Sequence, residues 1–142
     1  MSRFSVLIVD DDDNDRFFLK RLLRRAQLGD ITIFEETDGQ RALDFFLSYE
    51  KSRESALDDY PPLVLFLDIN MPIVDGFAFL EKFSQLRTQL CLESMAVLMF
   101  SSSNLSTDQQ NALSYDFVSG YLVKGKVDET QLKEVITPLL DR

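Results

Sequence analysis

Residues 63–72 read LVLFLDINMP, an apolar run followed by an acid and a turn. The run from Leu63 to Leu67 is apolar at every position, without the alternation of a strand that has one exposed face. Continuous runs of this kind are typical of parallel strands covered by helices on both faces. Asp68 follows the run directly, and Asn70 and Pro72 then begin a turn. These residues predict a buried strand that delivers a carboxylate to one end of a parallel sheet.

Four further apolar runs predict four more strands. The run from Ile31 to Phe34 alternates more than the others and is therefore expected at an edge of the sheet. Helical patterns lie between and after the runs, so strand and helix alternate five times, as in α/β proteins with helices on both faces of the sheet. The runs are Phe4 to Val9, Ile31 to Phe34, Met95 to Phe100 and Tyr121 to Val123, in addition to the central one.

The helices carry one-sided apolar stripes. Leu19, Leu22, Leu23 and Ala26 are spaced i, i+3, i+4, i+7, and a second stripe runs from Leu132 to Leu140. A capping residue followed three positions later by glutamine predicts helix starts at two places, Ser106 with Gln109 and Asp128 with Gln131. Residues 48–62 are weakly patterned and predict an exposed loop that extends the preceding helix.

Length and composition restrict the class of protein. The 142 residues suit one domain, and twelve Phe within 45% hydrophobic residues can fill a core without disulfides. The single Cys91 and the absence of a long apolar segment favour a cytoplasmic protein without a membrane span. The net charge of -9 disfavours direct binding to nucleic acid, and the basic run from Lys20 to Arg25 is best interpreted as a solvated helix face. Because histidine is absent, phosphoryl chemistry would have to use carboxylates.

The residues that follow the predicted strands form a chemically coherent set. Parallel sheets bind ligands beyond the carboxyl ends of their strands, and these positions hold an acid pair, a third acid, a hydroxyl and an amine. Carboxylates a few ångströms apart repel each other by about 4 kcal/mol per pair near a protein surface, and a bound Mg²⁺ would relieve that repulsion. A carboxylate can then attack phosphorus while the metal and a lysine neutralise the transferred group. The set is Asp10-Asp11, Asp68, Ser101 and Lys124.

Each of these residues also has an ordinary structural interpretation. The acids at 10–13 would stabilise a helix N-terminus, and Ser101 would serve as a cap or loop residue. Lys124 would be a solvated surface lysine, and Tyr121 would be a core aromatic. The combination of Asp68 and Lys124 with the acid pair favours the functional interpretation.

The motifs resemble those of the receiver domains of two-component response regulators from Phe4 to about Leu140. Val9-Asp10-Asp11 is similar to the family's acidic pair, and LDINMP at 67–72 with Asp75-Gly76 is similar to its phosphoacceptor strand and loop. Ser101 matches the hydroxyl position, and YLVK at 121–124 matches the switch aromatic and the active-site lysine.

The resemblance implies a three-layer, flavodoxin-like αβα fold with a five-stranded parallel sheet in the order 2-1-3-4-5. It implies Mg²⁺-dependent transfer from the phosphohistidine of a sensor histidine kinase to Asp68, followed by slow hydrolysis. Asp11, Asp68 and the Asn70 carbonyl would bind the metal directly and Asp10 through water, while Ser101 and Lys124 would contact phosphoryl oxygens. Movement of Ser101 and inward rotation of Tyr121 would signal to a downstream partner through the fourth helix, fifth strand and fifth helix. The same face is the expected homodimer interface.

Two features depart from the family pattern. Gly125 follows Lys124 where the family usually has a proline after a cis peptide bond, and a cis bond before a non-proline costs about 2.5–4 kcal/mol. A trans, flexible or shifted lysine loop is therefore expected. The long segment 48–62 is similar to that of single-domain regulators that serve phytochrome-like kinases. The chain is accordingly expected to be one receiver domain over residues 1–142 without an output domain.

Two other functions remain open from the sequence. A Mg²⁺-dependent phosphohydrolase can also use an aspartyl nucleophile, but such enzymes generally place a second carboxylate two residues later, where this chain has Asn70. A receiver-like interaction module that takes no phosphate would be consistent with Gly125, but not with the intact acid, hydroxyl and lysine set. We therefore expect a phospho-accepting signalling domain that catalyses only its own phosphorylation and dephosphorylation.

Overall fold

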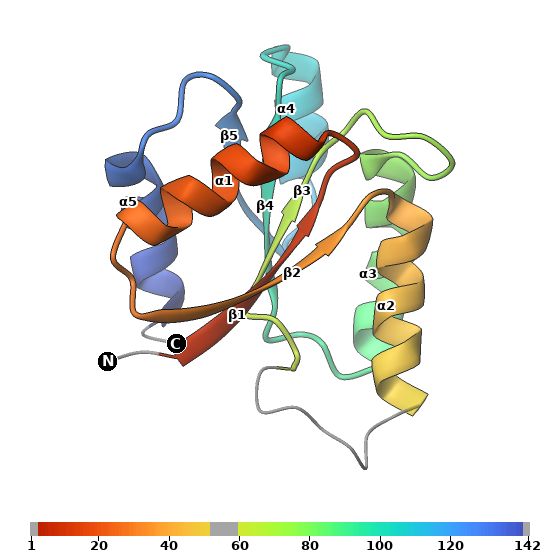
Figure 1. Ribbon diagram of the computed structural model, residues 1–142. Coiled ribbons are helices and arrows are strands. Elements are labelled where there is room, and N and C mark those ends of the chain that lie inside the picture. The colour runs from red at the N-terminus through yellow and green to blue at the C-terminus, as the bar shows by residue number, and fades with distance from the viewer. Residues whose placement is uncertain (1–2, 52–59, 141–142) are drawn as a thin grey trace.

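The computed structural model describes residues 3–51 and 60–140. Five parallel strands form one sheet in the order β2-β1-β3-β4-β5, which confirms the predicted topology (Figure 1). The strands are β1 (Arg3–Val9), β2 (Asp30–Glu36), β3 (Val64–Leu67), β4 (Ala96–Ser101) and β5 (Val118–Val123). The helices are α1 (Asp13–Arg25), α2 (Gly39–Lys51), α3 (Gly76–Gln89), α4 (Ser106–Leu113) and α5 (Glu129–Leu140).

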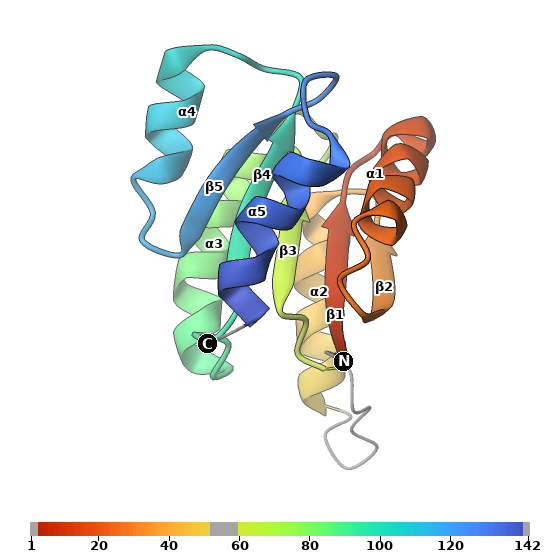
Figure 2. The same ribbon diagram turned by 90° about the vertical axis from the view of Figure 1, so that its left-hand side faces the viewer.

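Helices cover both faces of the sheet. Helices α1 and α5 lie against one face, and α2 and α3 lie against the other (Figures 1 and 2). Alternate residues of the central strands feed two separate hydrophobic cores: Leu65 and Leu67 of β3 belong to one, and Val64 and Phe66 to the other. This division explains why the central strand is apolar at every position.

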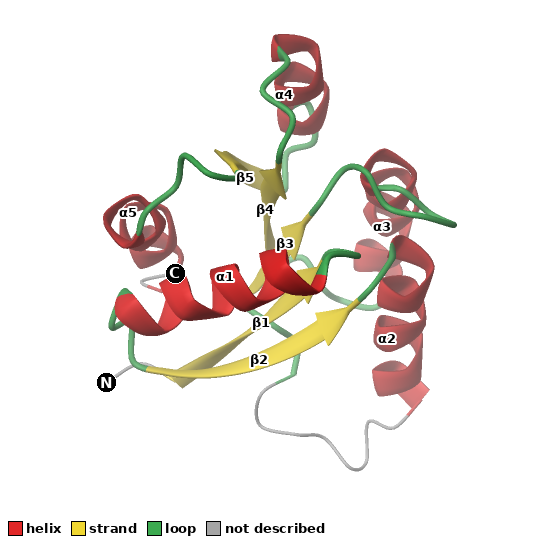
Figure 3. Ribbon diagram, turned by 45° about the horizontal axis from the view of Figure 1, so that its top comes forward, coloured by secondary structure: helices red, strands yellow, loops and turns green. Residues whose placement is uncertain are grey.

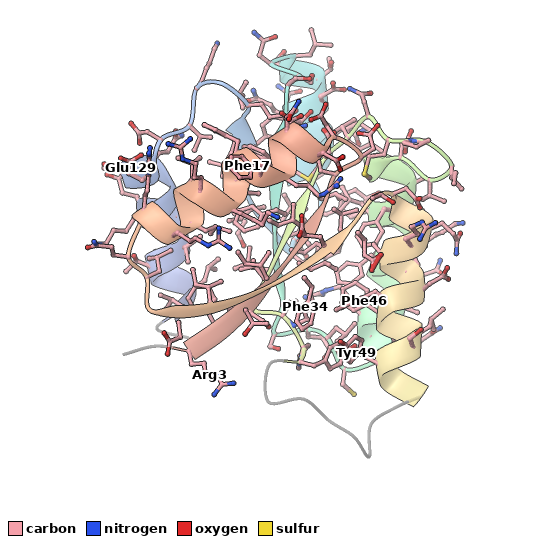
Figure 4. All side chains as sticks on the ribbon, viewed as in Figure 1. Arg3, Phe17, Phe34, Phe46, Tyr49 and Glu129 are labelled. Atoms are coloured by element: carbon pink, nitrogen blue, oxygen red, sulfur yellow. The ribbon has the colours of Figure 1, made fainter. Side chains whose placement is uncertain are left out.

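The core on the α2 and α3 side is rich in aromatic residues. Phe34 of the edge strand β2 packs against Tyr49 of α2, with ring centroids 6.0 Å apart, and both side chains lie between the sheet and α2 in Figure 4. Phe46 and Phe83 join α2 to α3 with ring centroids 5.3 Å apart. Aromatic pairs of this geometry add to the free energy gained from burial.

Two strand predictions need adjustment. The run from Ile31 to Phe34 does form an edge strand, β2, but pairing with β1 extends it from Asp30 to Glu36. Strand β5 begins at Val118, three residues before the predicted start. The prediction began too late because Ser119 and Gly120 interrupt the apolar run. Backbone pairing with β4 continues through these two residues, with a register shift between Val97 and Leu98.

One helix cap was predicted correctly and the other was wrong. The Asp128 side chain accepts a hydrogen bond of 2.8 Å from the Gln131 N–H at the start of α5, as predicted. Helix α4 has Leu105 at its N-cap, without a side-chain hydrogen bond, and Ser106 is its first helical residue. The hydroxyl that contacts the first turn of α4 belongs to Ser103, which donates to Asp108 at 2.6 Å.

The weakly patterned segment lies at the end of α2. The helix runs to Lys51, so it extends into the segment as predicted, while residues 52–59 lie outside the described part of the chain. At the far side the Tyr60–Pro61 peptide bond is cis. Among the described helices, none is both long enough and apolar enough to span a membrane.

Candidate phosphoacceptor site

The predicted site residues gather at the carboxyl edge of the sheet. Asp10 follows β1, Asp68 follows β3, Ser101 ends β4 and Lys124 follows β5. Backbone pairing continues past the strand ends: the Asp68 N–H donates to the carbonyl of Val9 at 3.0 Å, and the Lys124 N–H donates to that of Ser101 at 2.8 Å. The sheet therefore fixes the backbone from which these side chains extend. Figure 3 is turned so that this edge comes toward the viewer.

Three carboxylates form a compact acid cluster. One oxygen from each of Asp10, Asp11 and Asp68 lies within 4.8 Å of the other two. Asp10 and Asp68 are only 1% and 5% exposed, whereas Asp11 is open to solvent. Burial raises the pKa of Asp10 to about 6 despite its contacts with Lys124, and burial also raises the pKa of Asp68. Burial and the repulsion between the carboxylates thus both disfavour the ionised form of these acids.

The donor set of the cluster fits Mg²⁺. Oδ2 of Asp10 is buried and lies 2.8 Å from Nζ of Lys124, but it receives no geometrically acceptable hydrogen bond within the described residues. The Asn70 carbonyl oxygen also accepts no hydrogen bond there. Hard oxygen donors with one exposed carboxylate suit a small divalent cation that retains water and binds phosphate oxygens. Asp10, Asp11 and Asp68 are the residues of the cluster that would hold it, and the Asn70 carbonyl stays a prediction from the sequence.

The Asp68 loop is held by two close backbone approaches. The Gly76 N–H donates to the Ile69 carbonyl at 2.8 Å, and a Cβ on Gly76 would lie 2.4 Å from the Asp68 carbonyl oxygen. Only glycine allows α3 to begin so close to Asp68. The Ile69 N–H in turn donates to Oδ1 of Asp68 at 2.8 Å, which fixes the orientation of the carboxylate.

Lys124 bridges the carboxylates. Its Nζ lies 2.8 Å from Oδ2 of Asp10, 2.8 Å from Oδ2 of Asp15 and 3.2 Å from Oδ2 of Asp68. Burial alone would lower the pKa of Lys124, but the contacts of its ammonium with the Asp10 and Asp15 carboxylates and the charge of Asp68 outweigh burial and raise it. Lys124 therefore carries a full positive charge beside the Asp68 carboxylate.

The peptide bond after Lys124 is trans, because the only cis bond of the described residues is Tyr60–Pro61. Gly125 has a φ of +83°, and a Cβ added there would meet nothing within 4 Å. The absence of the cis bond does not displace the lysine, which still reaches Asp68. Of the three expectations for this loop, the trans bond is the one observed.

Ser101 and Tyr121 meet at Ser103 in the loop between β4 and α4. Ser101 is fully buried, and its Oγ accepts a hydrogen bond from the Ser103 N–H at 3.2 Å. The hydroxyl of the partly buried Tyr121 donates to the Ser103 carbonyl at 2.9 Å. Because Ser103 also donates to Asp108, one loop residue connects the strand end, the aromatic and α4.

Sequence reasoning did not identify Asp15 or Ser103. Asp15 lies in the first turn of α1, where acidic residues are common because they stabilise the helix N-terminus. An aspartate at this position therefore gave no sign of its contact with Lys124. Ser103 belongs to a run of three serines, of which only the strand-end Ser101 had a positional argument. For both residues the deciding information is a contact between distant segments.

A stability measurement can test the electrostatics of the acid cluster. The folded-state pKa of Asp10, about 6, lies above its ordinary value of 3.8, so the native protein loses stability as the pH rises between these values. Asp10→Asn has no charge to bury and should be more stable than wild type at pH 7.5 by roughly 1–3 kcal/mol. Urea unfolding with a chelator should show that gain shrinking toward pH 4.5. A variant less stable than wild type at pH 7.5 would contradict this account.

Known proteins provide the context for this geometry. The family model for the response regulator receiver domain matches residues 6–137. A two-component response regulator from Cytophaga hutchinsonii superposes with a TM-score of 0.80 at 26% identity, covering 98% of both chains. The bacteriophytochrome response regulator RtBRR is 31% identical with a TM-score of 0.72, covering 95% of this chain and 76% of that one.

A curated relative is much longer than this chain. The DNA-binding transcriptional regulator NtrC of Klebsiella pneumoniae is 35% identical over 115 residues, which are 81% of this chain. The matched region is 22% of NtrC, so the chain spans about a fifth of that relative. The family match, the parallel sheet and the acid cluster at its carboxyl edge together place the chain in the response regulator receiver domain family.

Proposed function

We propose that the chain accepts a phosphoryl group on Asp68 from the phosphohistidine of a sensor histidine kinase, in a Mg²⁺-dependent reaction. The observation that carries the proposal is the contact of 3.2 Å between Oδ2 of Asp68 and Nζ of Lys124, next to two further carboxylates. In this proposal the protein catalyses only its own phosphorylation and dephosphorylation and passes the signal to a downstream protein. Its cytoplasmic location remains a prediction from the sequence.

The proposed transfer exchanges one bond to phosphorus for another. One carboxylate oxygen of Asp68 forms a bond to phosphorus as the bond from phosphorus to the donor's imidazole nitrogen breaks, and that nitrogen keeps the electron pair. Lys124 lies where it can neutralise charge on the phosphoryl oxygens. When bound, Mg²⁺ supplies further neutralisation of these oxygens. Later attack by water on phosphorus releases inorganic phosphate and restores the Asp68 carboxylate.

The loop between β4 and α4 would carry the signal away from the site. If Ser101 moves to contact a phosphoryl oxygen, its Oγ can no longer accept from the Ser103 N–H. Ser103 also holds the Tyr121 hydroxyl and Asp108 of α4, so its displacement would change both contacts. The proposed switch therefore shifts the balance between two arrangements of the face built by α4, β5 and α5.

Exposed apolar side chains on the segments that follow the acids suit a protein donor. Phe17 of α1 is 59% exposed, and Ile73 of the loop after Asp68 is 82% exposed; Figure 4 labels Phe17 on its helix. Exposed apolar residues beside a reactive group are typical of a surface that binds a partner. The likeness to RtBRR supports a kinase of the phytochrome type as the donor. With a net charge of -9, we propose no direct binding of nucleic acid.

We also propose that phosphorylation favours a homodimer through α4, β5 and α5, and a downstream protein could use the same face. Helix α4 exposes Leu113 (47%) and, at its N-cap, Leu105. Light scattering with Mg²⁺ and beryllofluoride, a phosphoryl mimic, should show an increase in mass toward that of a dimer. Leu113→Glu should reduce the increase because it places charge in the apolar contact, and a monomer that is unaffected by the mimic would remove this part of the proposal.

The stoichiometry of labelling separates the proposal from a phosphohydrolase. We expect about one phosphoryl group per chain from acetyl phosphate, with slow release. An enzyme of the aspartyl-nucleophile class would need an acid and base near Asp68, and Asn70 occupies the position two residues later. Rapid multiple-turnover hydrolysis of small phosphate esters would favour the enzyme instead, and a chain that takes no label would favour the phosphate-independent module.

A further inference from the structure

Asp15 is the one carboxylate at Lys124 that lies outside the acid cluster. It sits in the first turn of α1, and its Oδ2 is 2.8 Å from Nζ of Lys124, 109 positions along the chain. The group of acids that could share a metal ion contains Asp10, Asp11 and Asp68, but not Asp15. Asp15 therefore contacts the lysine without being required by the proposed metal site.

The lysine needs such a contact because little else fixes its side chain. Its backbone N–H is held by the Ser101 carbonyl, but the next residue is Gly125, in a left-handed turn with open space around it. A lysine stem has about 2 kcal/mol of rotamer entropy to lose when its end is placed. The ring of Phe100, with its centroid 5.6 Å from Nζ, contacts one side of the ammonium and sets no unique position.

The other two partners of Lys124 change their roles during the proposed reaction. Asp68 loses its free carboxylate when it becomes an acyl phosphate, and Asp10 would share its charge with the metal. Asp15 takes part in neither of these changes, because it is neither the attacking group nor a member of the acid cluster. Its contact is also compatible with the working position of the lysine, because Nζ meets Asp15 and Asp68 at the same time, at 2.8 and 3.2 Å.

We propose that Asp15 is a positioning residue that holds the Lys124 ammonium beside Asp68 before and during phosphoryl transfer. The inference rests on the proposed function, since it assigns Lys124 a task in that reaction. It explains how the lysine is held in place although the peptide bond that follows it is trans. Asp15 itself touches neither the phosphoryl group nor the metal in this account.

Rates of labelling by acetyl phosphate test the proposal. Asp15→Ala should lower the maximal rate constant at saturating Mg²⁺ about tenfold, less than the roughly hundredfold loss typical when a direct stabilising donor is removed. The Mg²⁺ concentration for half-maximal rate should stay within about twofold of wild type, since Asp15 is outside the metal cluster. Asp15→Glu, which restores the charge, should recover most of the rate.

Asp13→Ala is the matched control, because Asp13 is an acid of the same helical turn and pairs with Arg16 instead of Lys124. It should label at the wild-type rate within about twofold, since it loses only the favourable charge at the helix N-terminus. Equal rates for the two alanine variants, or a weakened Mg²⁺ response in Asp15→Ala, would overturn the positioning role.

A second measurement does not depend on phosphorylation. Reductive methylation followed by mass spectrometry should show Lys124 reacting several-fold faster in Asp15→Ala than in wild type or Asp13→Ala, because loss of the Asp15 carboxylate makes the amine more accessible and easier to deprotonate. Unchanged reactivity would overturn the inference. If wild type takes no label but Lys124 responds to Asp15→Ala in this way, the proposed function fails while the contact that positions the lysine stands.

Discussion

Asp68→Asn should abolish phosphorylation by acetyl phosphate and by a phosphorylated histidine kinase. The variant keeps the shape of the side chain and the hydrogen bond from the Ile69 N–H, but it removes the anionic oxygen that attacks phosphorus. We expect labelling to fall at least about a hundredfold, which corresponds to roughly 3 kcal/mol of activation free energy or more. Incorporation of radiolabelled phosphate, or the mass of the intact protein, measures the extent of labelling.

The comparison needs a control that separates lost chemistry from lost folding. Asp75→Asn changes an acid in the same loop that caps α3 through the Ala78 N–H, and asparagine is an equally good cap. It should label within a few-fold of wild type, and circular dichroism should show all three proteins folded. A full yield of label on Asp68→Asn would mean that another residue accepts the phosphoryl group.

Removing Mg²⁺ should stop labelling almost as completely. Without the metal, the carboxylates at 10, 11 and 68 repel an incoming phosphoryl group, and Lys124 is the one cation in contact with Asp68 within the described residues. Metal ions stabilise such transition states by several kcal/mol, so a chelator should lower the rate by roughly a hundredfold or more. Stopped-flow or quench measurements across a Mg²⁺ titration give this ratio.

The same titration identifies the ligands. Asp11→Asn should shift the half-maximal Mg²⁺ concentration upward by about tenfold or more, because it removes the exposed carboxylate of the cluster. Asp12→Asn is the matched control: this neighbouring acid caps α1 through the Asp15 N–H, a task that asparagine performs equally well. Labelling that proceeds equally fast in chelator and in Mg²⁺ would contradict the assignment of the metal site.

The sequence was sufficient for the parts of the fold that depend on continuous burial. The run at 63–67 is apolar throughout because β3 contributes alternate side chains to the two cores, and this property is visible without coordinates. The same reasoning missed the start of β5, where Ser119 and Gly120 take part in pairing by their backbone alone. It also assigned the N-cap of α4 to Ser106, although Leu105 occupies that position. The hydroxyl that contacts Asp108 in the first turn of α4 belongs to Ser103.

The candidate site divides in the same way. Its strand-end residues were predictable, because the carboxyl ends of parallel strands all lie at the same edge of the sheet. Asp15 was not predictable, because an acid in a first helical turn needs no further explanation and its contact with Lys124 depends on how α1 lies across the sheet. Local patterns identify which residues reach the edge, whereas partners that approach from a helix require the packed structure.

The most direct test of the central claim is chemical localisation of the phosphoryl group. Borohydride reduces an aspartyl phosphate to homoserine, so tandem mass spectrometry of the labelled, reduced and digested protein reads the acceptor position. Homoserine is expected in place of Asp68, dependent on Mg²⁺ and on the phosphoryl donor, with the acids at 10, 11 and 15 intact. Homoserine at another acid, or phosphate on a serine such as Ser101, would contradict the central claim.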